Sequence, residues 1–307
     1  MNSNTSGPRR QVVSERRPET PALTVVLPTR DRRERLAETL AALAEQRGVE
    51  GGFEVVVVDD GSGDDTRELL ASPPAGLALR WRSQERRGPA AARNRGIALA
   101  RASRVLLLGD DTRPAPGALA EHLRSAGSRD LAVQGLIDWD PTAAVTPVMR
   151  FLAPAGPQFY FKGLTPGGPV PYTAVLGSNL SAPTAWFRDE PFDESFPDAA
   201  FEDTELAWRW QRRGRRTVYA PEALCWHRHH YADLEPFLAR QERAGRAVRR
   251  ALRRHPGMAG RVVAQPLAFG FYRLLRHGLR RAAGSGRRED GWDLACRRAF
   301  VRGLLGF

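Results

Sequence analysis

The chain has 307 residues, of which 42% are hydrophobic and 27% are charged, and this composition excludes a fibrous, collagen-like or wholly disordered protein. Its length is enough for one large domain with an appendage, or for two domains, without stabilisation by disulfides. The formal net charge is +12, and residues 235–307 account for all of this excess with 17 Arg and 5 acidic residues.

The two cysteines and the first 21 residues carry no sign of a secreted protein. Cys225 and Cys296 lie far apart and lack CxxC or zinc-finger spacing, so we expect neither a disulfide framework nor structural zinc. Residues 1–21 are polar and mixed in charge, which is typical of a flexible leader. No apolar run approaches the roughly 20 residues that span a bilayer. We therefore expect a cytoplasmic protein.

The first half of the chain alternates β-branched runs with helical stretches. Expected strands lie at 23–29, 53–62, 77–83 and 104–112. Expected helices lie at 32–46, 64–71 and 88–100. This alternation is the signature of βαβ units and predicts an α/β fold with a mostly parallel central sheet flanked by helices.

Two of these strands end in pairs of acidic residues, in the segments 59–62 (DDGS) and 110–112 (DDT). In open α/β sheets, ligands bind beyond the carboxyl ends of the strands. Each pair alone could equally form a turn or cap the following helix. The recurrence of an acidic pair after two apolar strands favours a shared site.

The second half is less regular. Residues 141–175 are rich in Pro, Gly and aromatics and predict irregular loops that shape a cleft. A helix is expected over 201–214 and a strand over 217–230. Five aromatic side chains in or near the loop segment could stack on a substrate or belong to the core, and these two interpretations stay open. They are Trp139, Phe159, Tyr160, Phe161 and Tyr172.

Carboxylates at strand ends suit a hard divalent cation, whose remaining coordination positions a diphosphate can fill. Asp110 and Asp111 are therefore the metal candidates. Histidine is a ligand suited to manganese, and three histidines lie at the end of the last expected strand, at positions 227, 229 and 230. A solvated His/Arg cluster is the alternative.

A third acidic pair, Glu202-Asp203, opens the helix expected over 201–214. Carboxylates in the first turn of a helix interact favourably with the helix dipole, and this is the structural interpretation. The functional one is a general base that removes a proton from an acceptor hydroxyl.

The Arg-rich segment 233–307 contains two amphipathic stretches, at 267–280 and 294–305. Helices of this pattern commonly pack on a domain with their basic face in water. Docking on an anionic membrane surface is the second interpretation. Nucleic-acid binding is the third and is not expected.

Six segments, in this order, resemble family 2 glycosyltransferases. They are LPTRDR at 27–32, VVDDGSGDDT at 57–66, GPAAARNRGIALA at 88–100, LLLGDDTRPAPGAL at 106–119, GSNLSAP at 177–183 and FDESFPDAAFEDTELAWRWQRRG at 192–214. No single motif is decisive, because DDGS and GDDT each arise by chance, but the order, spacing and strand context of the six segments together are strong evidence. The resemblance covers roughly residues 22–230.

The resemblance implies a GT-A fold. It implies a nucleotide-binding half at 22–112 and an acceptor half at 113–232, within one domain over 22–232 that is followed by a helical extension at 233–307. It also implies metal-dependent, inverting transfer of a sugar from a nucleotide diphosphate sugar to an acceptor hydroxyl. UDP is the family's commonest nucleotide, so a UDP-sugar and Mn²⁺ or Mg²⁺ are expected. The acceptor is a saccharide, a lipid-linked molecule or a small molecule.

Residue roles follow from the same resemblance. The nucleotide-sugar would contact Pro28, Thr29, Arg30, Asp59, Asp60, Gly61, Arg93 and Asp110. The metal would be held by Asp111, the more direct ligand, with Asp110 and His227. Asp203 would be the catalytic base, supported by Glu202. Asn179 and Glu202 would lie on the acceptor side.

The sequence departs from the family pattern in two places. Gly109-Asp110-Asp111-Thr112 has adjacent carboxylates rather than Asp-x-Asp. The QxxRW motif of polymer-making members is absent at 211–214, which favours transfer of one sugar. Two alternatives are a nucleotidyltransferase and an inert module that binds nucleic acid or lipid.

Overall fold

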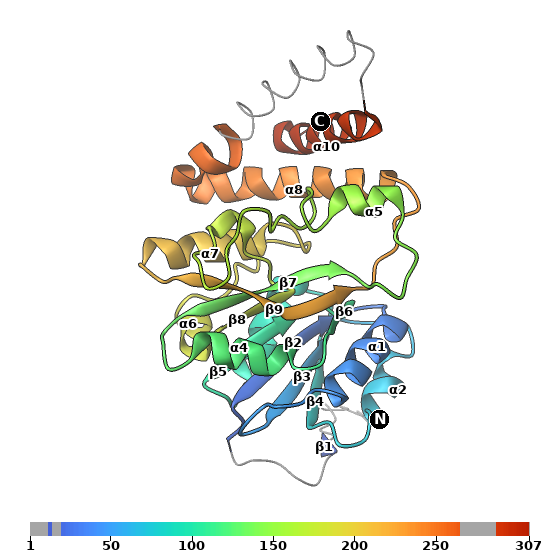
Figure 1. The fold of residues 1–307 in the computed structure, drawn as a ribbon, viewed down its shortest axis with the longest axis vertical. Helices are drawn as coiled ribbons and strands as arrows, with labels where there is room; N and C mark the ends of the chain where they lie inside the picture. Colours follow the sequence, from blue (N-terminus) through green and yellow to red (C-terminus); the bar gives the residue numbers. More distant parts are fainter. Residues whose placement is uncertain (1–11, 14–19, 265–286, 307) are drawn as a thin grey trace, which may run out of the picture.

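The computed structural model describes residues 12–13, 20–264 and 287–306. Its centre is a nine-stranded sheet in the order β1-β4-β3-β2-β5-β8-β7-β9-β6, with helices on both faces and a pair of helices stacked at one end (Figure 1). The α/β class predicted from the sequence is confirmed.

The first half of the sheet is a parallel block with strands in the order β4-β3-β2-β5. Its strands are β2 (Leu23–Thr29), β3 (Phe53–Asp59), β4 (Leu79–Ser83) and β5 (Arg104–Leu108). The connecting helices are α1 (Arg33–Ala44), α2 (Thr66–Ala71) and α3 (Pro89–Ala98). These seven elements were all expected. Both faces of β2 and β3 are buried, which is why their sequences are continuous apolar runs rather than alternating ones.

The second half of the sheet is mixed. Its strands are β8 (Asn179–Pro183), β7 (Ala132–Trp139), β9 (Thr217–His227) and β6 (Thr112–Pro114). β8 runs antiparallel to both β5 and β7, β9 runs parallel to β7, and β6 lies antiparallel to β9 at the edge. At the opposite edge, the short strand β1 (Val12–Val13) is antiparallel to β4 and falls within the expected leader.

The strand expected over 104–112 is interrupted. β5 ends at Leu108, and a turn at Gly109 and the two aspartates separates it from β6. A Cβ atom on Gly109 would lie 2.8 Å from the Thr112 hydroxyl oxygen and 3.0 Å from an oxygen of Asp111. Glycine therefore lets the chain turn tightly between the two strands.

Several elements were not anticipated from the sequence. They are α4 (Ala118–Ala126), α5 (Pro147–Leu152), α6 (Thr184–Asp189), the 3₁₀ turn η1 (Tyr172–Ala174) and the strand β7. The expected helix over 201–214 is α7 (Glu202–Arg212). Four of the five aromatics left open are core residues with at most 7% exposure, and only Tyr160, at 57%, is exposed.

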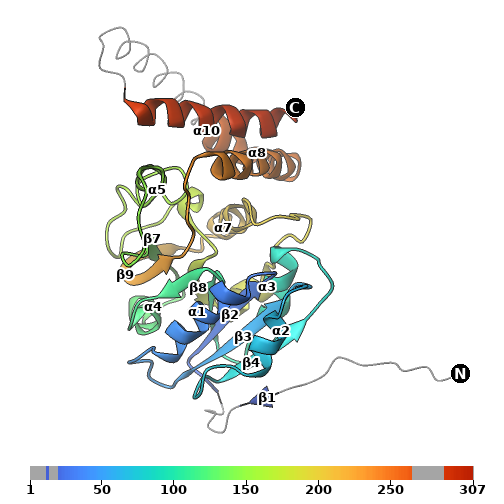
Figure 2. The same ribbon diagram turned by 90° about the vertical axis from the view of Figure 1, so that its right-hand side faces the viewer.

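The C-terminal part forms a helical layer beyond α7. It contains α8 (Glu235–Arg254), the short helical turns η2 (Pro256–Met258) and η3 (Gly260–Ala264), and α10 (Arg288–Leu305). α10 lies along α8, as Figures 1 and 2 show, and a Cβ on Gly303 would clash with the Glu242 carbonyl oxygen. The amphipathic stretch at 294–305 therefore packs on α8. The stretch at 267–280 lies outside the described residues.

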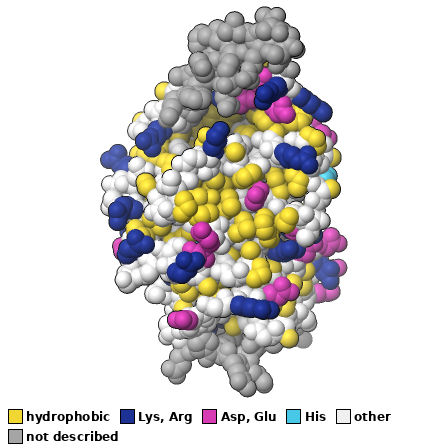
Figure 3. Space-filling view, in the orientation of Figure 1, with side chains coloured by type: hydrophobic (Ala, Val, Ile, Leu, Met, Phe, Trp, Pro, Cys, Tyr) yellow, Lys and Arg dark blue, Asp and Glu magenta, His cyan; other side chains and the backbone are white. Residues whose placement is uncertain are grey.

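Two observations concern how the protein could associate with a membrane. In the described part of the chain, no helix is long and apolar enough to cross a bilayer. On the face drawn in Figure 3, Lys and Arg side chains are dispersed, and hydrophobic side chains gather across the middle. Docking of residues 233–307 on an anionic membrane stays a prediction.

Candidate functional site

A cavity of about 500 Å³ opens at the carboxyl ends of β2 and β5 and is walled by α7 and α8. It brings together residues that are far apart in the sequence. Ten of the predicted site residues line it: Pro28, Thr29, Arg30, Asp60, Arg93, Asp110, Asp111, Glu202, Asp203 and His227. Only a fold that joins both halves of the sheet could place them in one cavity.

Asp59 and Gly61, by contrast, do not line this cavity. Asp59 is fully buried and accepts hydrogen bonds from the Ser62 amide at 2.8 Å, from the Ser83 hydroxyl at 2.9 Å and from Arg67 Nε at 3.1 Å. Burial raises the pKa of Asp59, but these hydrogen bonds outweigh it and leave the pKa lowered. Gly61 has φ +79°, which favours glycine. Both residues shape the loop after β3.

Asp60, the neighbour of Asp59, does line the cavity, but its carboxylate also holds the entry to α3. The amides of Arg87 and Gly88 each donate to it at 2.8 Å, and Gln84 Nε2 donates at 2.7 Å. Asp59 and Asp60 thus both organise turns, and Asp60 also lines the cavity, so its contact with a nucleotide stays a prediction.

Asn179 does not line the cavity either. Its side chain is fully buried, and its amide nitrogen donates to the Leu136 and Ala223 carbonyls at 3.0 and 2.7 Å. Its amide oxygen lies 2.9 Å from His122 Nε2. Burial lowers the pKa of His122 to about 4, so the neutral ring donates this hydrogen bond near pH 7. With its amide occupied, Asn179 joins β7, β8 and β9, and we do not propose a contact with the acceptor.

Asp110 and Asp111 form the acidic centre of the cavity. Thr29 Oγ1 donates to Asp110 Oδ2 at 2.9 Å, and the Thr39 hydroxyl donates to the Asp110 carbonyl, also at 2.9 Å. Burial, reinforced by the negative charge of Asp111, raises the pKa of Asp110 to about 6. The Nη1 atom of Arg32 lies 3.0 Å from Asp110 Oδ1 and 2.9 Å from Asp111 Oδ2. One guanidinium nitrogen thus bridges the two carboxylates.

His227, the last residue of β9, faces the same pair. Its Nε2 lies 3.6 Å from Asp111 Oδ2, and its buried Nδ1 has no hydrogen-bond partner in the described structure. Burial lowers its pKa to about 4, so near pH 7 the ring is neutral and can act as a ligand. For Asp111, burial raises the pKa, but the facing His227 and Arg32 outweigh it and the net direction is downward.

The side chains of Asp110, Asp111 and His227 suit a divalent cation, although they are not yet arranged as a complete set of metal ligands. Two carboxylates and a neutral imidazole are suitable ligands for Mn²⁺ or Mg²⁺, and Nε2 of His227 faces the carboxylate of Asp111. Across the residues that the structure describes, no three His, Cys, Asp or Glu side chains already form a metal cluster. Of the three histidines at positions 227, 229 and 230, His227 is the one that lines the cavity.

The first turn of α7 forms the opposite wall. Glu202 Oε1 accepts from Arg93 Nη1 at 2.5 Å, in an ion pair whose side chains are only 3% and 7% exposed. Burial raises the pKa of Glu202, and the charge of Arg93 opposes this rise. Asp203 is half-buried, and its Oδ2 accepts from the Gly177 amide at 2.9 Å. Asp203 thus presents an oriented carboxylate to the cavity.

Among the residues that the structure describes, two non-glycine residues adopt positive φ values, and each directly precedes a residue that lines the cavity. Asp31, at φ +51°, precedes Arg32, and Phe201, at φ +71°, precedes Glu202. Such conformations cost free energy and cluster at functional sites. The two strained backbone positions therefore lie at the same two walls of the cavity as the charged side chains, next to Arg32 and next to Glu202.

We expect Arg93→Met to lower the free energy of unfolding by about 3–5 kcal/mol, because it leaves the carboxylate of Glu202 buried without its partner. The measurement is urea denaturation at pH 7. Arg93→Met combined with Glu202→Gln should recover part of the loss, since the double variant carries no buried charge at this position. A loss below about 1 kcal/mol in the single variant would contradict the interpretation.

Sequence reasoning missed three cationic residues of the cavity, which are Arg32, Arg86 and Arg240. Arg32 lies inside the segment 27–32 and could have been found from its position beside Arg30. Arg240 lies on α8, within the helical extension expected over 233–307, but no residue of that extension was assigned to the site.

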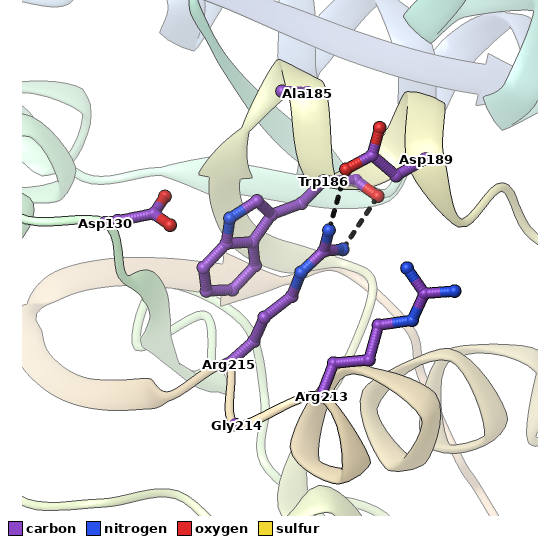
Figure 4. Close-up of a pocket in the computed structure, with 7 residues that line it drawn as sticks. All are labelled: Asp130, Ala185, Trp186, Asp189, Arg213, Gly214 and Arg215. Atoms are coloured by element: carbon purple, nitrogen blue, oxygen red, sulfur yellow. Dashed lines mark hydrogen bonds and ion pairs between the residues drawn. The ribbon is translucent and has the colours of Figure 1, made fainter.

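A second hollow, of about 420 Å³, lies elsewhere and shares no lining residue with this cavity. Figure 4 shows Arg215 reaching toward Trp186 and Asp189. Its Nη2 donates to Asp189 Oδ2 at 2.8 Å, and its Nη1 donates to the Trp186 carbonyl at 3.1 Å. Because these groups already satisfy one another, this hollow is not the candidate site.

Comparison with known families gives two matches. The model of glycosyl transferase family 2 matches residues 24–159. The model of glycosyl transferase family group 2 matches residues 104–295, which is more than half of the chain.

Two curated relatives show the extent of the similarity. Validoxylamine A glucosyltransferase of Streptomyces hygroscopicus subsp. limoneus is 31% identical over 224 residues, covering 63% of this chain and 49% of that protein. Pre-mycofactocin glycosyltransferase of Mycobacterium tuberculosis is 28% identical over 259 residues, covering 78% and 50%. The chain thus spans about half the length of these relatives.

Two solved structures share the fold. The mannosyltransferase PcManGT from Pyrobaculum calidifontis, in complex with GDP-Man and Mn²⁺, has a TM-score of 0.60 at 19% identity, over 94% of this chain and 88% of that one. S. aureus TarS 1–349 in complex with UDP has a TM-score of 0.54 at 18% identity, over 92% and 88%. At these identities the likeness shows the fold, and it confirms the predicted architecture.

Proposed function

Because the chain belongs to glycosyltransferase family 2, we propose that it transfers one sugar from a nucleotide diphosphate sugar to an acceptor hydroxyl, with inversion at the anomeric carbon. The observation that carries this proposal is the convergence of Asp110, Asp111, Arg93 and Asp203 on one cavity. Family membership favours a transferase over the nucleotidyltransferase and over the inert binding module.

The donor would lie along the carboxyl ends of β2 and β5. Thr29 and Asp60 line this part of the cavity and would contact the nucleotide, and Arg93 would face the diphosphate. Guanidinium groups suit phosphate oxygens because they offer several donors in a planar fork. A UDP-sugar is the expected donor.

A divalent cation would be held by Asp111, Asp110 and His227, and it would supply Lewis-acid stabilisation of the charge on the departing nucleoside diphosphate. PcManGT, which shares the fold of this chain, was solved with Mn²⁺, and this supports the assignment of a divalent cation.

Asp203 would act as the general base. Its Oδ2 is oriented by the Gly177 amide, and its other oxygen accepts from the Thr204 amide at 2.8 Å. The carboxylate would take the proton of the acceptor hydroxyl as that oxygen attacks the anomeric carbon from the face opposite the diphosphate. Glu202 holds Arg93, so it supports the base through the position of α7 rather than by touching the acceptor.

The acceptor would enter from the side of α8. Phe237, Arg240 and Gln241 of this helix line the cavity together with Phe159. The guanidinium of Arg240 and the amide of Gln241 suit the hydroxyl groups of a saccharide or a molecule that carries a phosphate. Saccharide, lipid-linked and small-molecule acceptors all meet this description.

Calorimetric titration of UDP, GDP and dTDP, each with and without Mn²⁺, tests the proposal. We expect one nucleotide to bind more tightly when Mn²⁺ is present. The corresponding nucleotide-sugar should release a nucleoside diphosphate, not pyrophosphate, on turnover. The GDP arm is included because a structural relative was solved with GDP-Man. Failure of all three nucleotides to bind would contradict the proposal.

A further inference from the structure

We propose that Arg32 is the resident counter-cation of the Asp110–Asp111 pair, that a divalent cation displaces it, and that the released guanidinium then binds the donor diphosphate. Metal and nucleotide would therefore bind cooperatively. This inference rests on the proposed function and adds a residue and a coupling to it.

The first step concerns charge. Asp110 is 6% exposed and the Asp111 side chain is 15% exposed, so two adjacent carboxylates share a poorly hydrated position. Like charges in such a position need a cation nearby if both are to ionise. Arg32 Nη1 meets this need with contacts of 3.0 and 2.9 Å, one to each carboxylate.

The second step concerns position. The two oxygens that Arg32 bridges are Asp110 Oδ1 and Asp111 Oδ2, and Asp111 Oδ2 is also the oxygen nearest His227 Nε2, at 3.6 Å. A divalent cation between the carboxylates and the imidazole would occupy the place of the guanidinium. Metal and Arg32 therefore compete for the same oxygens.

The third step concerns mobility. The Arg32 side chain is 47% exposed, although the carboxylates that it contacts are nearly buried. It lies between β2 and α1, directly before the first residue of the helix, and it lines the same cavity as Arg93. Nη1 is the nitrogen that makes both carboxylate contacts. Rotation about the side-chain bonds of Arg32 can therefore separate the guanidinium from both carboxylates without moving a strand or a helix.

These steps give a thermodynamic consequence. When no nucleotide is present, the metal must break both contacts of Arg32 and return the guanidinium to water. With a diphosphate bound, the displaced guanidinium gains a new anionic partner, which offsets that loss. The nucleotide therefore raises the affinity for the metal, and by linkage the metal raises the affinity for the nucleotide by the same factor.

The test is a titration of the full chain with Mn²⁺ alone, with free Mn²⁺ followed by electron paramagnetic resonance. We expect Arg32→Met to bind Mn²⁺ about tenfold more tightly than the unsubstituted protein, because the competing cation is gone. Repeating the titration with saturating UDP should show that the gain in metal affinity from nucleotide is several-fold smaller in Arg32→Met. A purely structural role for Arg32 would not raise the affinity for Mn²⁺.

Two variants serve as controls. Arg33→Met removes an exposed arginine next in the sequence, and it should bind Mn²⁺ as the unsubstituted protein does. Arg32→Lys keeps a cation and should remain close to the unsubstituted protein. If Arg32→Met unfolds more easily, Mn²⁺ should raise its Tm more than it raises the Tm of Arg33→Met.

The outcomes separate this inference from the proposed function. If the unsubstituted protein binds Mn²⁺ and Arg32→Met binds it no more tightly, the inference is wrong and the proposed function stands. If Mn²⁺ binds neither protein, both without nucleotide and with saturating UDP, the inference and the metal-dependent function are both overturned.

Discussion

Asp203→Asn is expected to lower kcat by about 10²–10⁴-fold, because the variant has no group that can accept the proton of the acceptor hydroxyl. The amide is nearly the same size as the carboxylate, and its oxygen can still accept from the Gly177 amide. Nucleotide affinity should therefore change little. The measurement combines steady-state release of nucleoside diphosphate with calorimetric titration of the nucleotide.

Asp198→Asn is the matched control for this variant. Asp198 is exposed and lines the same cavity, but we assign it no role in binding or in chemistry. Its substitution should leave kcat within about twofold. Turnover by Asp203→Asn close to that of the unsubstituted protein would falsify the assignment of the base. A separate measurement of the anomeric configuration of the product by NMR would test inversion.

Asp111→Asn is expected to weaken metal-dependent nucleotide binding by about 10²-fold, because it removes a charged oxygen ligand from a site that has few. Affinity for divalent cations follows the number of charged ligands, and an amide oxygen is a poor replacement for a carboxylate. Calorimetric titration of the nucleotide at several Mn²⁺ concentrations gives both the affinity and the metal requirement.

The result for Asp111→Asn should differ from that for Asp203→Asn in one respect. Loss of the base lowers turnover at saturating donor, whereas loss of the metal ligand weakens binding of the donor itself. Asp198→Asn again serves as the control. A metal requirement in Asp111→Asn that equals that of the unsubstituted protein would count against Asp111 as a ligand.

Local patterns were sufficient for the parallel half of the sheet. The strand expected over 23–29 is β2 (Leu23–Thr29), with the same bounds, and the apolar run in 53–62 contains β3 (Phe53–Asp59). These strands are buried on both faces, and their neighbours along the chain are the helices that cover them. Because the contacts that stabilise each βαβ unit are close in sequence, the hydrophobic pattern of the chain was sufficient to predict these strands and helices.

Local patterns failed where an element depends on distant contacts. The 20 residues of α8 contain few large apolar side chains, and Phe237, Val248 and Ala251 are among the small number that are buried. Gly245 of this helix approaches the backbone of α10 so closely that a Cβ would lie 2.1 Å from the Phe300 carbonyl oxygen. These buried residues have the spacing of one helix face, but much of that face consists of glycine and alanine, so the pattern does not show what the helix packs against. Its contribution to the cavity, Arg240, was missed for the same reason.

The sequence by itself determined the α/β class, the family resemblance and the identity of the acidic residues at the strand ends. Those features depend on the order of strands and helices along the chain and on short sequence motifs. Only the tertiary structure decided which of the predicted polar groups face the cavity. Asp59 and Asn179 are satisfied by partners within the fold, whereas Asp203 faces the cavity and Asp111 shares one arginine with Asp110. The physical reason is that a polar side chain can meet a ligand only where it lines a cavity, and the elements that form the cavity are distant in sequence: Thr29 and Asp110, which share a hydrogen bond, are 81 residues apart.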